Sequence, residues 1–183
     1  KRSRDHAIPQ GDLNRLLVEK AREGKTVVRL KGGDPYVFGR GGEEATELQE
    51  DNVPFEVVPG ISSIVAAPNY AGIPLTHREH CSSFTVITGH EDPDKAETAI
   101  DWERIAREPG TKVVLMGVER IGKITAALKE NGLAGDTPVA MVRWGTTGRQ
   151  QTISGTLDTI ADVNQDDPAE SLIDNDLRGN IDH

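Results

Sequence analysis

The segment that decides the fold runs Lys31-Gly32-Gly33-Asp34-Pro35-Tyr36-Val37-Phe38-Gly39-Arg40-Gly41-Gly42, directly after a short apolar run. Five of its twelve residues are glycine, which permits tight turns and a close approach of a ligand to the backbone. It lacks the Gly-Lys-Ser/Thr ending of a P-loop and the Gly-x-Gly-x-x-Gly spacing of a Rossmann loop. A strand followed by such a turn is typical of an α/β domain, where ligands gather at the carboxyl ends of strands.

The residues on both sides of this segment alternate between helical and strand patterns. Apolar residues at 13, 16, 17 and 21 share one helical face, and Gly24 is placed to end that helix. The composition predicts strands at Thr26–Leu30 and Phe55–Val58, with a helix at Glu43–Glu50 between them. A further helix is expected to begin near Ser62 and Ser63, whose side chains suit an N-cap.

The second half repeats the alternation of strands and helices. Strands are expected at Phe84–Thr88, Lys112–Met116, Val139–Val142 and Gln151–Ser154, and helices around Trp102 and Ile105, at 121–128 and at Thr156–Ala161. The sequence therefore predicts an N-terminal α/β domain at 1–79 and a C-terminal α/β domain at 80–163. The polar segment 164–183 has no apolar period and is expected to be disordered.

Composition excludes several classes of function. The chain has 183 residues, 21 of them Lys or Arg and 30 of them Asp or Glu, for a net charge of −9. An acidic balance argues against nucleic acid as a partner, and no run reaches the roughly 20 apolar residues that a membrane span needs. The single Cys81 excludes a disulfide within the chain. We therefore expect a cytoplasmic protein that does not bind membranes.

Four strand ends carry residues that suit a ligand. Asp34 is placed to accept hydrogen bonds from a ribose or an amine, or simply to cap its own turn. The stretch Pro59–Ser63 offers backbone N–H groups and two hydroxyls to an anion, although plain helix capping would use the same residues. Met116 and Trp144-Gly145 end two later strands, where core packing and ligand contact both remain open.

The histidines do not predict a metal site. His77 and His80 are three residues apart, but the sequence indicates neither a helix nor a third ligand beside them. Cys81 is expected to be a buried small residue rather than a nucleophile. No metal is expected.

Several of these segments, taken in order, resemble the tetrapyrrole methylases. The likeness extends over about residues 1–163, and its longest motifs are Val27–Glu44, Val57–Ile61 and Ala71–Arg78. Shorter matches in the second half include Thr88-Gly89-His90, Met116-Gly117 and Gly145-Thr146-Thr147. The resemblance implies two α/β domains with S-adenosyl-L-methionine bound in a cleft between them, and a homodimer.

The resemblance also implies a reaction. Within the family, the expected activity is methylation of uroporphyrinogen III at C2 and C7 to give precorrin-2, which feeds sirohaem and cobalamin. S-adenosyl-L-homocysteine would be the second product, and no metal would take part. Two alternatives stay open, namely a methylase of a later precorrin and a non-catalytic fragment that binds the cofactor without turnover.

The family motifs assign roles to individual residues. Those carried over as cofactor-binding are Gly32, Gly33, Asp34, Val37, Ser62, Ser63, Met116, Ala140 and Gly145. Lys1 matches a lysine assigned as a proton donor, and Arg2, Arg40 and Arg78 are expected to meet the substrate carboxylates. Ser62-Ser63 departs mildly from the Thr-Ala usual in the family.

Two family features are not found in this sequence. The family's first strand, its Gly-x-Gly-Pro-Gly-Asp loop and a segment with a catalytic aspartate would all precede Lys1. At the other end, a polar sequence follows Pro168 where the family has an apolar strand. We therefore expect a partial chain of the enzyme.

Overall fold

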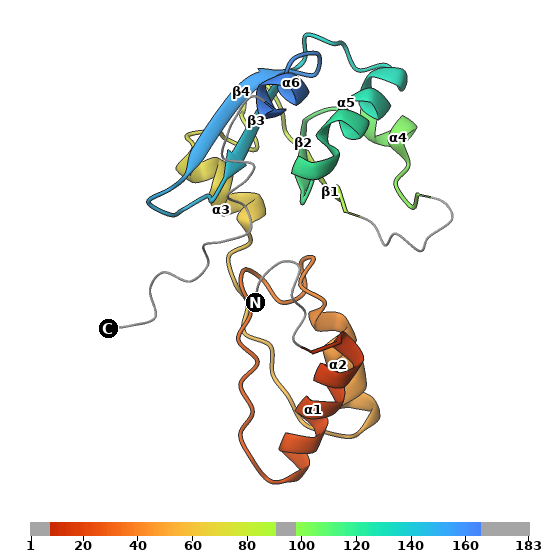
Figure 1. Ribbon diagram of the computed structural model, residues 1–183, viewed down its shortest axis with the longest axis vertical. Helices are drawn as coiled ribbons and strands as arrows, with labels where there is room; N and C mark the ends of the chain where they lie inside the picture. The colour runs from red at the N-terminus through yellow and green to blue at the C-terminus, as the bar shows by residue number, and fades with distance from the viewer. Residues whose placement is uncertain (1–7, 91–97, 166–183) are drawn as a thin grey trace. The chain divides into compact units, whose positions relative to one another are not determined.

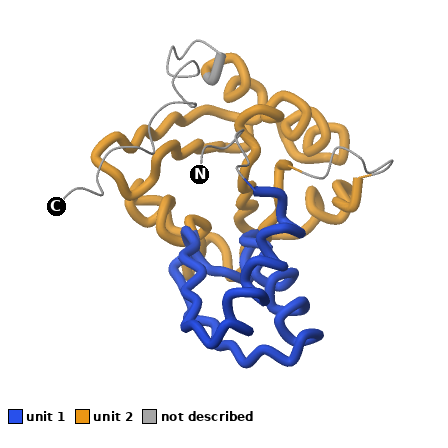
Figure 2. The backbone as a smooth tube through the Cα atoms, turned by 60° about the horizontal axis from the view of Figure 1, so that its bottom comes forward, with its two compact units in different colours: residues 1–62, 168–183 blue, residues 63–167 orange. Residues whose placement is uncertain are grey.

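The computed structural model describes residues 8–90 and 98–165, with side chains up to residue 163. The chain divides into two compact units, and the division falls between Ser62 and Ser63 (Figure 2). Lys1, Arg2 and the segment 166–183 lie outside the described residues. Among the described helices, none combines the length and the apolar composition that crossing a bilayer requires.

The first unit is built on two packed helices, α1 (Gln10–Arg22) and α2 (Gly41–Glu50) (Figure 1). The predicted apolar face of α1 is confirmed in part, because Leu17 is buried and Leu13 and Ala21 are half-buried, whereas Leu16 stays 36% exposed. The buried Val18 was not part of the predicted face. The helix stops where expected, since Gly24 adopts a left-handed φ of 76°. The second helix matches its predicted range to within two residues.

The two strands predicted in this unit are wrong. Thr26–Leu30 and Phe55–Val58 have no regular secondary structure, and in the described part of the chain neither joins a β-ladder. A strand is defined by backbone hydrogen bonds to a neighbour, and β-branched composition cannot supply that neighbour. Val28, Leu30 and Val58 are accordingly 82%, 84% and 73% exposed.

The second unit begins with α3 (Ser63–Tyr70), and its described residues form two separate two-stranded sheets. The first pairs β1 (Phe84–Thr88) in parallel with β2 (Thr111–Leu115), in register from Phe84 opposite Thr111 to Thr88 opposite Leu115. Between them lies α4 (Trp102–Arg107), which is capped by the Asp101 side chain accepting from the Arg104 N–H at 2.9 Å. This strand–helix–strand order is the predicted α/β pattern.

The second sheet is the antiparallel pair of β3 (Pro138–Arg143) and β4 (Gln151–Thr156) (Figure 1). The short η1 (Val118–Arg120) and α5 (Ile121–Glu130) precede it, and α6 (Ile160–Gln165) follows. The expected antiparallel strand at Gln151–Ser154 is confirmed. The last helix was predicted at Thr156–Ala161 but begins only at Ile160, because a turn at 157–159 follows β4.

The core of the second unit lies among its helices and the parallel sheet. It consists of the buried residues Ile87, Ile105, Ile124, Leu128 and Leu157. Ile124 and Leu128 come from one face of α5, so the predicted helical period does place them inside. Beside this core, the carboxyl ends of β1 and β2 lie next to each other, with Thr88 opposite Leu115.

Candidate functional site

The glycine-rich loop of the first unit turns tightly around one carbonyl group. The Gly41 N–H donates to the Pro35 carbonyl oxygen at 2.9 Å, and Arg40 takes a left-handed φ of 58° just before α2. A Cβ built on Gly39 or Gly41 would lie 2.6 Å or 2.4 Å from the same oxygen. Glycine is therefore required at both positions for the loop to close on the helix.

This loop lies directly against the Pro59-Gly60 turn. A Cβ on Gly60 would lie only 2.2 Å from the Gly33 carbonyl oxygen. On the other side, a Cβ on Gly33 would come within 3.7 Å of the Ser62 Cα. The structure therefore brings the predicted Gly33, Asp34 and Ser62 together. The need for glycine at Gly60 follows only from this contact with Gly33, which lies 27 positions away in the chain.

Asp34 holds the two loops together. Its Oδ2 accepts the Gly60 N–H at 3.0 Å, and its Oδ1 accepts the Tyr36 N–H at 2.9 Å. These two hydrogen bonds, the Gly60 bond first, lower the pKa of the Asp34 carboxyl below its ordinary value. Asp34 is thus a carboxylate at neutral pH, with lone pairs left over for a further donor.

Several groups of the loop are accessible to a ligand. At Gly32 the position of a Cβ has no atom within 4 Å, so the backbone is open to a ligand on that side. Val37 is 38% exposed and offers an apolar contact. Open backbone, an apolar side chain and an ionised acid are the groups that would bind a nucleoside with a charged tail.

Ser63 is the first residue of α3 and is exposed, whereas Ser62 is half-buried and precedes the helix. The expected helix start at this pair is confirmed. The role of either serine toward a cofactor stays a prediction.

In the second unit, Met116 follows β2 and is 55% exposed in a left-handed conformation with a φ of 56°. The core alternative for this residue is therefore excluded. The next residue, Gly117, lies against Gly89, which follows β1. A Cβ on Gly89 would lie 2.4 Å from the Gly117 Cα. The residues that follow the carboxyl ends of β1 and β2 are thus in close contact, and the Met116 side chain is exposed to solvent.

Two further cofactor candidates lie in the hairpin of the second sheet. Ala140 is exposed on β3. Gly145 lies against α3, since a Cβ there would be 2.6 Å from the Ala67 Cβ. The packing of Gly145 on α3 explains why this position has no side chain, independently of any ligand.

Of the candidate substrate cations, Arg40 and Arg78 are described and their side chains are accessible. Arg40 donates from Nε and from a terminal nitrogen to the Glu43 carboxylate at 3.0 Å and 2.7 Å, so a substrate carboxylate would have to displace Glu43. Arg78 is exposed in the turn between His77 and Cys81. Lys1 and Arg2 lie outside the described residues.

The same turn brings a third potential metal ligand to the two histidines. Atoms of His77, Glu79 and His80 that could bind a metal lie within 4.8 Å of one another, and all three residues are exposed. The sequence did not indicate Glu79. However, His77 Nδ1 already accepts the Glu79 N–H at 3.2 Å. In this hydrogen bond the lone pair of Nδ1 is used, and the other ring nitrogen, Nε2, carries the proton. The expectation of no metal stays a prediction.

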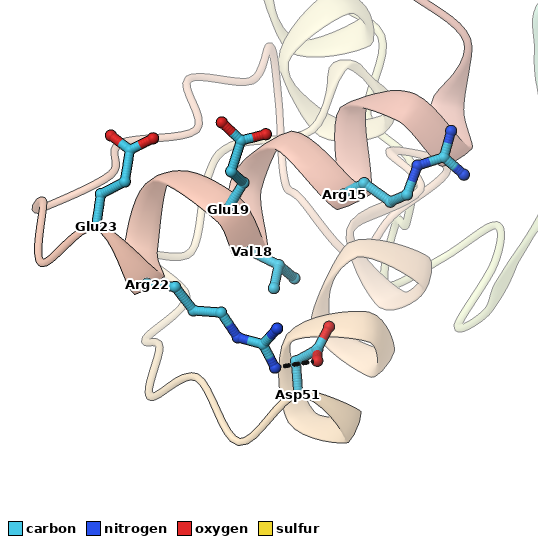
Figure 3. Close-up of a pocket in the computed structure, with 6 residues that line it drawn as sticks. All are labelled: Arg15, Val18, Glu19, Arg22, Glu23 and Asp51. Carbon is cyan, nitrogen blue, oxygen red and sulfur yellow. Dashed lines mark hydrogen bonds and ion pairs between the residues drawn. The ribbon is translucent and has the colours of Figure 1, made fainter.

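A surface hollow on the first unit lies away from the glycine-rich loop residues. It is lined by Arg15, Val18, Glu19, Arg22, Glu23 and Asp51 (Figure 3). Arg22 and Asp51 form an ion pair across it, between the end of α1 and the end of α2. These charges are exposed and partly paired with one another. The Arg22–Asp51 ion pair joins the two helix ends, and the hollow gives no reason to place the ligand site there.

The sequence matches known proteins along most of its length. Residues 1–161 match the family model described as Tetrapyrrole (Corrin/Porphyrin) Methylases. An S-adenosyl-L-methionine-dependent uroporphyrinogen III methyltransferase from Methanosarcina barkeri is 56% identical over 158 residues, which are 86% of this chain and 62% of the relative. A sirohaem synthase from Chromobacterium violaceum is 52% identical over 153 residues, or 84% of this chain and 32% of the relative.

A solved structure shares the fold. The uroporphyrin-III C-methyl transferase of Thermus thermophilus, in complex with S-adenosyl homocysteine, superposes with a TM-score of 0.74 at 39% identity. The match covers 85% of this chain and 67% of the solved one. This confirms the predicted α/β fold class, and the chain spans about two-thirds or less of the curated relatives described above.

Proposed function

The chain belongs to the tetrapyrrole (corrin/porphyrin) methylases. We propose on this basis that the protein methylates uroporphyrinogen III at C2 and C7 to form precorrin-2. The observation that carries the proposal is the loop 32–40 with Asp34 bound to Gly60, found in a chain 56% identical to a uroporphyrinogen III methyltransferase. The product would serve sirohaem or cobalamin formation.

The proposed ligand at this loop is S-adenosyl-L-methionine, whose sulfonium supplies an activated methyl group. Gly32 and Gly33 would let the ligand approach the backbone, and Asp34 would accept hydrogen bonds from its hydroxyl or amino groups. Val37 would cover an apolar part. Ser62 and Ser63 in the first and second units, and Met116, Ala140 and Gly145 in the second, complete the proposed set of cofactor contacts.

The chain's contribution to methyl transfer would be mainly positional. Displacement at a sulfonium carbon needs the nucleophilic carbon in line with the breaking bond, and holding both reactants in that geometry supplies much of the rate. Proposed cation partners for the substrate carboxylates are Arg2, Arg40 and Arg78, and Lys1 is the proposed proton donor. In a protein with a net charge of −9, these cations have to be concentrated at the site.

Binding and turnover test this proposal separately. Calorimetry with S-adenosyl-L-homocysteine should show saturable one-site binding, and incubation with uroporphyrinogen III and the methyl donor should give a doubly methylated product by mass spectrometry. Binding without turnover would favour the non-catalytic alternative, and turnover only with an already methylated precorrin would favour the later-precorrin alternative. The absence of both activities would contradict the proposal.

A homodimer and a cytoplasmic location are further proposals from the family resemblance. Light scattering on the eluting protein would decide the first, since a single species at twice the 19.8 kDa chain mass is expected. A monomer at micromolar concentration would contradict it. Fractionation of the source cells would decide the second.

A further inference from the structure

A buried carboxylate on α2, outside the proposed cofactor contacts, accepts hydrogen bonds from two other segments of the first unit. Glu44 lies in the first turns of α2 and is 5% exposed. Its Oε1 accepts from Gln10 Nε2 in α1 at 3.1 Å and from Arg29 Nε at 3.2 Å. Lys31 Nζ donates to both carboxylate oxygens, at 2.9 Å and 3.1 Å. One side chain therefore ties α1, α2 and the segment 29–31 together.

The charges in this cluster depend on one another. The side chains of Lys31 and Glu44 are only 9% and 6% exposed, whereas that of Arg29 is 31% exposed. A buried charge is tolerated only when it is paired and hydrogen-bonded, and removing one partner leaves the other uncompensated. Without the Glu44 carboxylate, the Lys31 ammonium would have to leave its position to reach water.

The position of this cluster in the chain links it to the glycine-rich loop. Lys31 is the residue immediately before Gly32, and α2 begins immediately after Arg40. The Lys31–Glu44 ion pair thus joins the entry of the loop 32–40 to the helix that forms its exit. A loop rich in glycine has many accessible conformations, so its shape depends on how its two ends are held.

We propose that Glu44 is a positioning residue for the cofactor loop: by holding Lys31 against α2, it maintains the shape of residues 32–37 that binds S-adenosyl-L-methionine. This inference rests on the function proposed above. Glu44 itself does not touch the ligand and acts only through Lys31 and the loop ends. A residue that merely packed α1 on α2 would contribute to folding stability and leave the affinity of the folded protein unchanged.

The chain offers a matched control in the neighbouring carboxylate. Glu43 is in the same helix turn, is 53% exposed and pairs with Arg40 instead of Lys31. Glu44→Gln keeps the size of the side chain but removes its charge and replaces one acceptor oxygen with an NH2 donor, and Glu43→Gln makes the same change at an exposed position. Both variants, with the wild type, would be measured for S-adenosyl-L-homocysteine affinity, for KM and kcat, and for amide hydrogen exchange.

We expect Glu44→Gln to weaken S-adenosyl-L-homocysteine binding about tenfold, equal to about 1.4 kcal/mol. KM for the methyl donor should rise by a similar factor while kcat stays within about twofold, because saturating ligand restores the loop. The amides of residues 32–37 should exchange faster without ligand. Glu43→Gln should leave the affinity and the exchange of these amides unchanged.

A double variant makes the test specific to Lys31. Lys31→Met combined with Glu44→Gln leaves no buried ammonium without a partner, so its affinity should lie between those of Glu44→Gln and the wild type. If Glu44→Gln alone does not fold, the double variant replaces it in every measurement. Loss of folding stability with unchanged affinity, KM and loop exchange would overturn the inference.

The exchange measurement also separates this inference from the proposed function. If the wild type binds no S-adenosyl-L-homocysteine, the proposed function fails, and faster exchange at 32–37 in Glu44→Gln still supports the control of the loop. Unchanged exchange there, with or without ligand binding, contradicts it.

Discussion

The Asp34 carboxylate joins the glycine-rich loop to the Pro59-Gly60 turn, because its Oδ2 accepts the Gly60 N–H at 3.0 Å. Asp34 and Gly60 are 26 positions apart in the chain. The two segments lie so close together that the Gly33 carbonyl oxygen leaves no room for a side chain at Gly60. The candidate cofactor site of the first unit is therefore formed by two segments together.

Replacing Asp34 should weaken the cofactor site more than it weakens the fold. We expect Asp34→Ala to lower S-adenosyl-L-homocysteine affinity by at least about tenfold, since it removes an acceptor for the ligand and two loop hydrogen bonds. Calorimetry measures the affinity. Asp12→Asn is the control, because Asp12 is exposed on α1 and pairs with Arg15. Undiminished binding in Asp34→Ala would contradict its assignment.

A methyl group at Gly60 should force the two loops apart. The added Cβ in Gly60→Ala would meet the Gly33 oxygen at 2.2 Å, and overpacking of this kind costs about 1–3 kcal/mol. Urea unfolding should show the loss, together with reduced ligand affinity. Gly42→Ala has no atom within 4 Å of its new Cβ and should be neutral or slightly stabilising. Equal behaviour of the two variants would refute this account of the turn.

The close approach of the parallel strand ends gives a matching prediction in the second unit. Gly89→Ala would place a Cβ 2.4 Å from the Gly117 Cα, which should destabilise this unit by about 1–3 kcal/mol. Gly122→Ala, in the first turn of α5 with open space around its Cβ, should instead stabilise slightly, by less than the roughly 1 kcal/mol typical of a helix interior. Thermal unfolding of both variants checks the opposite signs.

Low pH should protonate the Glu44 carboxylate and weaken its contacts with Lys31 and Arg29. Burial alone would raise the pKa of Glu44, but hydrogen bonds from Lys31 and Gln10 and the charge of Arg29 outweigh it and hold the pKa below the ordinary 4.5. A lowered pKa in the folded state means that the contribution to stability is complete above about pH 4.5 and is lost as the pH falls below it. The free energy of unfolding, measured with urea, should therefore fall less steeply below about pH 4.5 in Glu44→Gln than in the wild type. Parallel pH profiles would exclude a role for this carboxylate.

The exposed arginine of the 77–81 turn should affect substrate and not cofactor. Arg78→Ala is expected to raise KM for uroporphyrinogen III several-fold, by removing one charge-assisted contact to a carboxylate, while S-adenosyl-L-homocysteine affinity stays the same. Arg107→Ala, exposed on α4 and paired with Glu103, is the control. A parallel loss of cofactor affinity in Arg78→Ala would show that the turn supports the cofactor site instead.

Local sequence patterns predicted most of the described helices and the strands of the second unit. The apolar period of α5 and the β-branched runs of β1 and β2 predict elements that the structure confirms within about two residues, because neighbouring residues decide propensity and periodicity. Thr26–Leu30 has the same β-branched composition and still forms no ladder in the described part of the chain. Pairing depends on a partner segment that no local window contains.

By itself the sequence determined the family, the α/β class and the glycine-rich loop with Asp34 as a candidate site, since these depend on residue types in a fixed order. Only the tertiary structure decided that Asp34 binds Gly60, that Gly89 lies against Gly117, and that Lys31 is held by a buried Glu44. Each of these contacts joins segments between 13 and 28 residues apart. The physical reason is that burial and close packing are properties of the folded chain, so they assign a role to Glu44 that its exposed neighbour Glu43 does not share.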